Sequence, residues 1–319
     1  MIDIILNIIF TYLTVAVAYL GILAIGSFFY KRPQGVAFPE RFNRIAILVP
    51  AYKEDNVIVS VAKSHLDQNY PSDKYDVVII ADSMKDSTMK ELALLPIILI
   101  DVNFDKSTKV KSLNFAMDQL DDNYDLAVIA DADNVLEKDF LTKINGAYLT
   151  DKYEVIQTRR TAKNAETPYA VLDGISEGIN NTLFRQGAYG LGLSSSFIGS
   201  GMVFYFHKLK KALKELNTVG GFDKVLQLNL IAQGTRIHFL NDVFIYDEKI
   251  STAEAYRNQR TRWYSSHYKY FIKGLGDGFR NLIKGNFDYF NIAVLYHLFP
   301  SRVMLIGLIG LFTLMAISF

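Results

Sequence analysis

Four short apolar runs in the first half of the chain constrain its fold more than any other feature. Each is rich in β-branched residues and ends at a proline or a carboxylate: Arg44–Pro50, Asp76–Asp82, Ile97–Asp101 and Asp125–Asp131. Continuous apolar runs of this length are typical of strands buried on both faces of a parallel sheet, with helices in the connections. The chain is therefore predicted to be an α/β protein.

Carboxylates stand at the C-terminal ends of two of these runs. Asp82 closes the second run, and Asp131-Ala-Asp133 closes the fourth. In open α/β sheets, ligands bind beyond the carboxyl ends of the strands. Alternate residues of an extended chain point to one side, so Asp131 and Asp133 together suit a divalent cation that keeps open positions for phosphate oxygens. A solvated turn after a strand has the same pattern, and both interpretations stay open at this point.

Composition narrows the chemistry. The chain has no cysteine, and its five histidines are scattered without a paired-ligand spacing. Disulfides, thiolate metal sites and cysteine nucleophiles are thereby excluded, and oxygen ligands favour Mg²⁺ or Mn²⁺. The loop Val49–Asp55 contains no glycine, which disfavours a dinucleotide-binding fingerprint or a P-loop. A net charge of +1 gives no electrostatic reason to expect nucleic acid as a partner.

Apolar segments at both ends predict membrane association. Residues 4–30 carry no charge and are long enough to cross a bilayer. Basic residues follow this stretch, whereas in a cleavable signal peptide they precede it, so a membrane helix is favoured over a signal peptide. We expect a transmembrane helix over residues 1–30 and a C-terminal transmembrane segment over 291–319. The sequence stops inside this second segment, so a truncation is left open. Basic residues on the domain side predict a multi-pass protein of the cell (inner) membrane with its central domain in the cytoplasm.

Residues 261–290 mix aromatic and basic side chains. This pattern is typical of an amphipathic helix lying in the headgroup region, and an ordinary surface helix is the alternative.

Two helix starts carry charged residues. Lys109 begins a helical pattern, where its charge could add to an anion site, although a solvated helix start has the same pattern. Asp223 precedes a helical pattern over residues 224–233 that stops at Gly234, and it could equally be the helix N-cap.

A basic and aromatic cluster is more specific. Gln259, Arg262 and Trp263 share one face of a helix by their i, i+3 and i+4 spacing. An amide and a guanidinium beside an indole suit a diphosphate and an adjoining sugar ring. A Trp-Arg pair at a membrane interface is the alternative.

In this order, the motifs resemble the inverting family 2 glycosyltransferases of the cellulose, chitin and hyaluronan synthase type. The resemblance covers about residues 44–270 and rests on Val49-Pro-Ala-Tyr52, Ala81-Asp82, Asp131-Ala-Asp133, a later aspartate before a helix, and Gln259-x-x-Arg262-Trp263. Phe197-Ile-Gly-Ser-Gly201 resembles the acceptor loop of the family. A GT-A-like mixed-sheet domain over residues 40–260 is thereby implied, flanked by the two membrane segments.

The resemblance also implies roles for individual residues. Asp133 would hold the Mg²⁺ or Mn²⁺ ion, and Asp223 would be the general base, although Gly221-Phe222 replaces the Thr-Glu pair that precedes this aspartate in the family. Trp263, Gly199 and Ser200 would lie at the acceptor end. Contacts with the nucleotide are implied for Ala51, Tyr52, Asp82, Lys109, Asp131, Gln259 and Arg262.

The function implied is a membrane-bound inverting hexosyltransferase of polysaccharide biosynthesis. It would move a sugar from a nucleotide-sugar, a UDP-sugar in particular, to a hydroxyl of a growing glycan or lipid-linked acceptor, in contact with membrane lipid. A membrane partner subunit is left open. One alternative is a catalytically inactive relative that acts as a membrane binding or regulatory protein, which the altered motif before Asp223 would suit. A sugar nucleotidyltransferase is the other, and it would need neither membrane helices nor the Gln259-x-x-Arg262-Trp263 motif.

Overall fold

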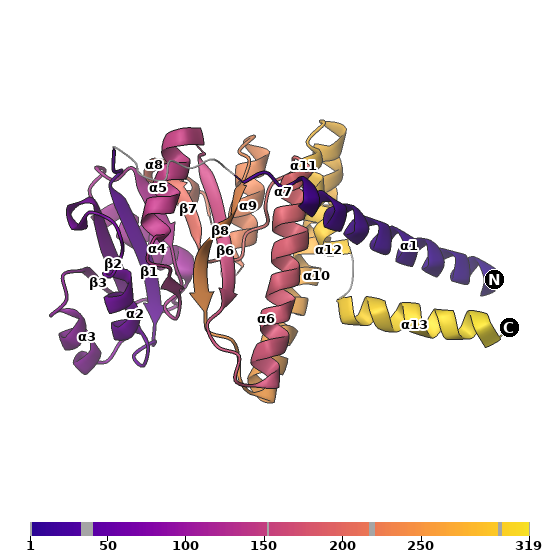
Figure 1. Ribbon diagram of the computed structural model, residues 1–319, viewed down its shortest axis with the longest axis horizontal. Helices are drawn as coiled ribbons and strands as arrows, with labels where there is room; N and C mark the ends of the chain where they lie inside the picture. The colour runs from indigo at the N-terminus through magenta and orange to yellow at the C-terminus, as the bar shows by residue number, and fades with distance from the viewer. Residues whose placement is uncertain (1, 33–40, 152, 217–220, 299–301, 319) are drawn as a thin grey trace.

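The computed structural model describes residues 2–32, 41–151, 153–216, 221–298 and 302–318 (Figure 1). Its centre is one eight-stranded mixed sheet in the order β3-β2-β1-β4-β7-β6-β8-β5. The strands are β1 (Ile45–Tyr52), β2 (Tyr75–Asp82), β3 (Ile98–Val102), β4 (Leu126–Ile129), β5 (Val135–Leu136), β6 (Val155–Ala162), β7 (Met202–Tyr205) and β8 (His238–Asp247).

The four predicted strands are β1 to β4, and all three pairings among them are parallel. The sheet becomes mixed at β7, which pairs antiparallel with both β4 and β6. Both the predicted α/β class and the mixed sheet are confirmed.

Helices cover both faces of the sheet. The longer elements are α1 (Ile2–Gly26), α2 (Ile58–His65), α3 (Asp86–Leu92), α4 (Lys109–Gln119), α5 (Phe140–Asp151), α6 (Pro168–Asn180), the π-helix η3 (Asn181–Gly187), α8 (Phe206–Lys214), α9 (Phe222–Ala232), α10 (Ala253–Ile283) and α13 (Arg302–Ser318). Shorter helical elements lie between these, among them α7 (Ala188–Gly190), α11 (Phe287–Phe290), η4 (Asn291–Leu295) and α12 (Tyr296–Leu298).

The core forms two apolar layers because neighbouring strand residues point to opposite faces. In β1, Leu48 packs into the layer that contains Leu113 of α4 and Leu226 of α9. Its neighbour Ile47 packs into the other layer, which contains Phe140 of α5. Burial on both faces explains why these strands read as continuous apolar runs in the sequence.

The ends of β1 and β2 lie side by side and turn without glycine. Tyr52 pairs in register with Asp82, and each is followed by a residue in the left-handed region, Lys53 (φ 57°) and Ser83 (φ 57°). The Lys53 backbone N–H donates to the Asp82 carbonyl oxygen at 3.1 Å. Residues other than glycine adopt this backbone conformation at a cost in free energy, and such strain is concentrated at functional sites.

Helices α1 and α13 lie side by side and project away from the sheet (Figure 1). Phe10 and Phe312 contact each other with ring centroids 5.4 Å apart, and Leu13 of α1 packs with Leu305 of α13. Among the described residues, only Ile4–Phe29 is long and apolar enough to cross a membrane, because the apolar part of α13, Met304–Leu314, is shorter. The predicted multi-pass arrangement is therefore not supported.

Helix α10 is continuous over 31 residues. The predicted boundary between residues 260 and 261 falls inside it, so the Gln259-x-x-Arg262-Trp263 motif and the aromatic, basic segment after it belong to one helix.

Candidate active site

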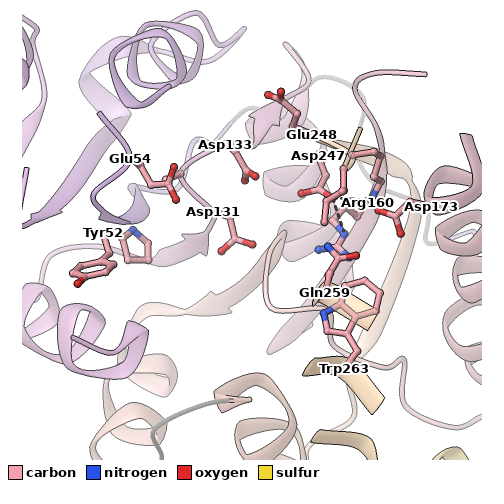
Figure 2. Close-up of a pocket in the computed structure, with 14 residues that line it drawn as sticks. Tyr52, Glu54, Asp131, Asp133, Arg160, Asp173, Asp247, Glu248, Gln259 and Trp263 are labelled. Carbon is pink, nitrogen blue, oxygen red and sulfur yellow. Dashed lines mark hydrogen bonds and ion pairs between the residues drawn. The ribbon is translucent and has the colours of Figure 1, made fainter. Parts of the chain in front are cut away.

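A cavity of about 500 Å³ opens at the C-terminal ends of β1 and β4 (Figure 2). Carboxylates from the strand ends face charged groups from β6, β8 and α6 across this cavity, and α10 supplies an amide and an indole. The lining residues are Pro50, Tyr52, Glu54, Asp131, Ala132, Asp133, Arg160, Asp173, Asp247, Glu248, Lys249, Ile250, Gln259 and Trp263.

Asp131 and Asp133 both line the cavity, but they do so from a turn. Strand β4 ends at Ile129, and the Asn134 backbone N–H donates to the Asp131 carbonyl oxygen at 3.1 Å. The two carboxylates do reach one cavity, but a turn brings them there in place of strand alternation. Their partners differ accordingly: Asp131 pairs with Lys109, whereas Asp133 accepts a hydrogen bond from Asn134 Nδ2 at 2.9 Å.

Asp133 lies where a negative charge is costly. Burial, with added repulsion from Asp247 and Asp131, raises the pKa of Asp133 to about 6. A divalent cation would relieve this repulsion. Among the described residues no group of three or more histidine and carboxylate side chains could hold a metal ion. These carboxylates therefore fit an ion that takes most of its ligands from phosphate oxygens and water, as Mg²⁺ commonly does.

Asn134 organises the turn from behind. It is fully buried, and its Nδ2 donates to Asp133 Oδ1 and to Asp247 Oδ1, each at 2.9 Å. Its Oδ1 accepts from the Ser200 hydroxyl. Ser200 is itself buried and does not line the cavity, and its hydroxyl accepts from the Asp131 backbone N–H at 3.1 Å, so it lies behind the Asp131 turn. Sequence reasoning missed Asn134, although it directly follows Asp131-Ala-Asp133.

Lys109 links Asp131 to the predicted acceptor loop. Its Nζ pairs with Asp131 and donates to the Gly199 carbonyl oxygen at 2.7 Å. Lys109 is the first residue of α4, and the Thr108 side chain caps that helix, as the predicted helix start requires. Gly199 has φ +83°, and a Cβ added to it would lie 3.9 Å from Asp223 Cγ. Asp131, Lys109, Gly199 and Asp223 thus form one continuous group beside the cavity.

Asp223 lies in the first turn of α9 and is not its N-cap. That position belongs to Gly221 in the left-handed conformation (φ 60°), and no side chain caps the helix. A Cβ on Gly221 would lie 2.3 Å from the Tyr270 hydroxyl, so the close approach of α10 also requires glycine here. The helix-cap alternative for Asp223 is therefore wrong.

Tyr52 is half exposed and lines the cavity, whereas Ala51 is buried in β1. Asp82 is buried beside Tyr52 and outside the cavity lining. Its Oδ1 accepts from the Ser83 hydroxyl at 2.9 Å, but its buried Oδ2 has no hydrogen-bond partner. A buried carboxylate oxygen without a donor is costly, and a ligand could supply the donor.

The predicted common face of α10 is only partly correct. Gln259 and Trp263 line the cavity, whereas Arg262 is exposed and does not. Successive side chains of an α-helix point about 100° apart, so when Trp263 points into the cavity, Arg262 points away from it. Arg260 lies on the inner side instead, paired with Asp173 and with its guanidinium 4.6 Å from the Trp263 ring. Gln259 Oε1 is buried without a hydrogen-bond partner.

A buried ion network, which sequence reasoning also missed, forms the wall behind Asp247. Glu177 of α6 accepts from Arg160 at 2.7 Å and from Arg185 at 2.9 Å. Lys249 pairs with Asp247 at 2.7 Å. Burial alone would raise the pKa of Glu177, but the three cations around it hold that pKa well below its usual range. One signal was available: Asp173, Glu177 and Arg185 recur on one side of an otherwise uncharged helical stretch.

Comparisons with known proteins agree with this arrangement. The family model described as "Glycosyltransferase like family 2" matches residues 43–266. The mannosyltransferase PcManGT from Pyrobaculum calidifontis, solved with GDP-Man and Mn²⁺, has a similar fold, with a TM-score of 0.59 and 18% identity over 83% of this chain and 76% of that one.

Relatives of similar sequence share a name. A beta-monoglucosyldiacylglycerol synthase of Nostoc sp. is 24% identical over 72% of this chain and 50% of that protein. One from Synechocystis sp. is 22% identical over 82% of this chain and 56% of that protein. The chain thus spans about half the length of the curated relatives it matches. With the family model covering more than half of its residues, from β1 to the Gln259-x-x-Arg262-Trp263 helix, the chain belongs to the family 2-like glycosyltransferases.

Proposed function

We propose that this chain is a membrane-bound inverting hexosyltransferase that transfers a sugar from a nucleotide-sugar to a hydroxyl of a lipid acceptor. The observation that carries the proposal is the cavity, which is lined by the half-buried Asp133 carboxylate with its raised pKa and by the amide and indole of α10. The names of the relatives support a diacylglycerol-type lipid over a growing glycan. The GDP-Man and Mn²⁺ in the structural relative support a nucleotide-sugar and a divalent ion, with a UDP-sugar as one candidate donor.

In the proposed reaction, the acceptor hydroxyl gives its proton to Asp223 while its oxygen attacks the anomeric carbon. The bond from that carbon to the diphosphate oxygen breaks, and the electron pair leaves with the nucleoside diphosphate. Asp133 would hold a Mg²⁺ or Mn²⁺ ion, which would supply positive charge to the leaving diphosphate. Gln259 would orient the diphosphate, and a single displacement inverts the anomeric centre.

The remaining assignments are also part of the proposal. The nucleotide would lie against Tyr52, Ala51 and Asp82, where the free Asp82 Oδ2 could accept from the base or ribose. Lys109 and Asp131 would contact it as a pair. Trp263 would stack on the acceptor sugar or glycerol, and Arg262 would reach the diphosphate only after a change of its side-chain direction.

Membrane attachment would run through α1, with α13 beside it and the catalytic domain in the cytoplasm. A membrane partner subunit is not required for transfer to a single lipid.

Neither alternative function is favoured. An inactive binding protein has no use for the half-buried Asp133 carboxylate, whose repulsion by Asp247 and Asp131 costs folding free energy unless a cation binds. A nucleotidyltransferase would release pyrophosphate, whereas the similar proteins are named as a beta-monoglucosyldiacylglycerol synthase and a mannosyltransferase.

The proposal can be tested with a donor panel. Detergent-solubilised protein would be mixed with diacylglycerol, Mn²⁺ or Mg²⁺, and UDP-glucose, UDP-N-acetylglucosamine or GDP-mannose. We expect release of a nucleoside diphosphate that requires both one donor and the lipid, and that stops when a chelator removes the metal. Full turnover in excess chelator would remove the ion from the mechanism. In a separate reaction with UTP and glucose 1-phosphate, release of pyrophosphate would favour the nucleotidyltransferase.

A further inference from the structure

The element formed by α6 and η3, residues 168–187, has its charges inside and its apolar side chains outside. Its three charged residues, Asp173, Glu177 and Arg185, are all buried. Large apolar side chains on the outer side are exposed instead: Val171 (40%), Leu172 (53%), Ile175 (56%) and Ile179 (38%). A helix that faces water shows the reverse distribution.

The buried charges fix this orientation. Glu177 binds Arg160 and Arg185, and Asp173 binds Arg260 of α10. Rotating α6 to hide its apolar side would leave these partners buried and unpaired, at a large cost. The apolar side is therefore held outward by the ion network, and its exposure is a fixed feature of the fold.

This element and the short turn α7 that follows it hold the domain ends of both projecting helices. A Cβ on Gly187 of η3 would lie 2.0 Å from the Leu23 carbonyl oxygen, and one on Gly190 would lie 2.1 Å from that of Gly26, so α1 packs backbone against backbone here. Arg302, the first residue of α13, donates to Asn180 Oδ1 at 2.8 Å and to the Ser176 hydroxyl at 3.1 Å. Beyond these contacts, α1 and α13 project away from the domain (Figure 1).

We propose that the exposed apolar face of α6, formed by Val171, Leu172, Ile175 and Ile179, binds the surface of a lipid bilayer. The inference rests on the proposed membrane attachment through α1, because the apolar stretch Ile4–Phe29 ends close to η3, where Gly187 packs against Leu23. Exposed aromatic residues of α10, among them Tyr264 and Tyr268, would extend the contact.

This contact would bring the site to the lipid. Asp173 lies on the inner side of α6 and lines the cavity. One helix therefore separates the proposed lipid surface from the active site, and an acceptor with its tails in the bilayer could present its hydroxyl without leaving the membrane.

The absence of cysteine from the sequence makes a direct test simple. Ile175→Cys and Ile179→Cys would each be labelled with bimane in the full chain and reconstituted into phosphatidylglycerol/phosphatidylethanolamine vesicles that carry a nitroxide near the lipid headgroup. Leu94→Cys is the control, since Leu94 is 85% exposed just after α3, at the opposite end of the sheet (Figure 1).

We expect the nitroxide lipid to quench the labels at residues 175 and 179 several-fold more strongly than the label at residue 94. Equal quenching at all three positions would overturn the proposal. Shielding of the label at 175 by self-association in detergent, without quenching in vesicles, would assign the face to a second copy and would also overturn it.

A second measurement separates this inference from the proposed reaction. In Ile175→Asp/Ile179→Asp, transfer to diacylglycerol embedded in vesicles should fall about tenfold, while donor hydrolysis by water stays unchanged. Leu94→Asp should alter neither rate. Unchanged transfer in the double variant contradicts the lipid contact. A wild-type protein that neither transfers nor hydrolyses any donor contradicts the proposed function, and the quenching result still decides the role of the α6 face.

Discussion

Two sets of charged side chains meet at the cavity, and they shift the pKa of a carboxylate in opposite directions. On the strand side, Asp133 is crowded by Asp131 and Asp247, and its pKa rises to about 6. On the α6 side, Glu177 is more deeply buried, yet Arg160, Arg185 and Lys249 hold its pKa below the usual range. Burial alone would raise both pKa values; the difference is whether the protein supplies the opposite charge.

This contrast distinguishes charged residues that are available to bind a ligand from those that stabilise the fold. Charges that the protein pairs internally hold elements together and lose stability when a partner is removed. Charges left without internal counter-charges destabilise the free protein and are available to a ligand. Substitutions on the strand side should therefore change activity with little loss of stability, and those on the α6 side should do the reverse.

Asp223→Asn should show the largest effect. The amide keeps the size of the carboxylate but cannot accept the proton, so we expect transfer to fall about 10²- to 10⁴-fold. Donor affinity, measured by calorimetry, and the melting temperature should stay close to those of the wild type. A variant that keeps wild-type turnover would place the base elsewhere.

Glu177→Gln should act through stability. It leaves Arg160 and Arg185 without their shared carboxylate, and breaking a buried ion pair from one side typically costs about 3–5 kcal/mol. The free energy of unfolding would be measured by denaturant titration in detergent. Glu91→Gln on the exposed surface of α3 is the matched control and should change it by less than about 0.5 kcal/mol. Equal stability of the two variants would show that the network does not hold α6.

Asp133→Asn should stabilise the metal-free protein. Because its pKa is raised from 3.8 to about 6, the native carboxyl favours its protonated form, and the wild type loses stability as pH rises from about 4 to above 6. The asparagine variant avoids this loss, so at pH 7.5 in chelator it should be more stable by about 2–3 kcal/mol.

Below pH 4 the wild type and Asp133→Asn should melt alike. Adding Mn²⁺ with UDP should stabilise only the wild type. A variant that is less stable than the wild type at pH 7.5 in chelator would mean that Asp133 is internally paired, and the contrast between the two sides would fail.

Trp263→Ala should give the smallest effect of the four variants, because the indole supplies contact area to the acceptor and carries no charge. Loss of the indole should raise the KM for the acceptor about tenfold, through lost stacking area, and leave donor affinity unchanged. With both variants measured in detergent, Tyr264→Ala is the matched control, because Tyr264 is similarly exposed (44% against 41%) and does not line the cavity. If both variants lose only membrane partitioning, Trp263 is an interfacial anchor.

The strands and the strand-end carboxylates could be predicted because local patterns encode them. The runs that became β1 to β4 are apolar and β-branched, and the fourth is followed by Asp131 and Asp133, which line the cavity. The ion network could not be predicted in the same way, because Arg160, Glu177 and Lys249 are far apart in sequence and meet only after the sheet forms.

The direction of Arg262 depends on the rotation of α10 about its axis. That rotation is fixed by Arg260 and Asp173, whose pairing spans 87 residues of sequence. The burial of Ser200 depends likewise on its contact with Asn134 across 66 residues.

The close glycine contact between α1 and η3 couples the orientation of the N-terminal helix to that of the domain. Gly187 and Gly190 approach the α1 backbone at Leu23 and Gly26, and the Leu191 side chain also packs against Gly26, so the contact leaves little room for movement. A membrane helix longer than the local hydrocarbon layer accommodates by tilting. Tilting of α1 would turn the catalytic domain with it and change the angle at which the cavity meets the bilayer. Bilayer thickness would then act on the enzyme mechanically, and an alanine at residue 187 should be less well tolerated than most substitutions in the carboxylate turn.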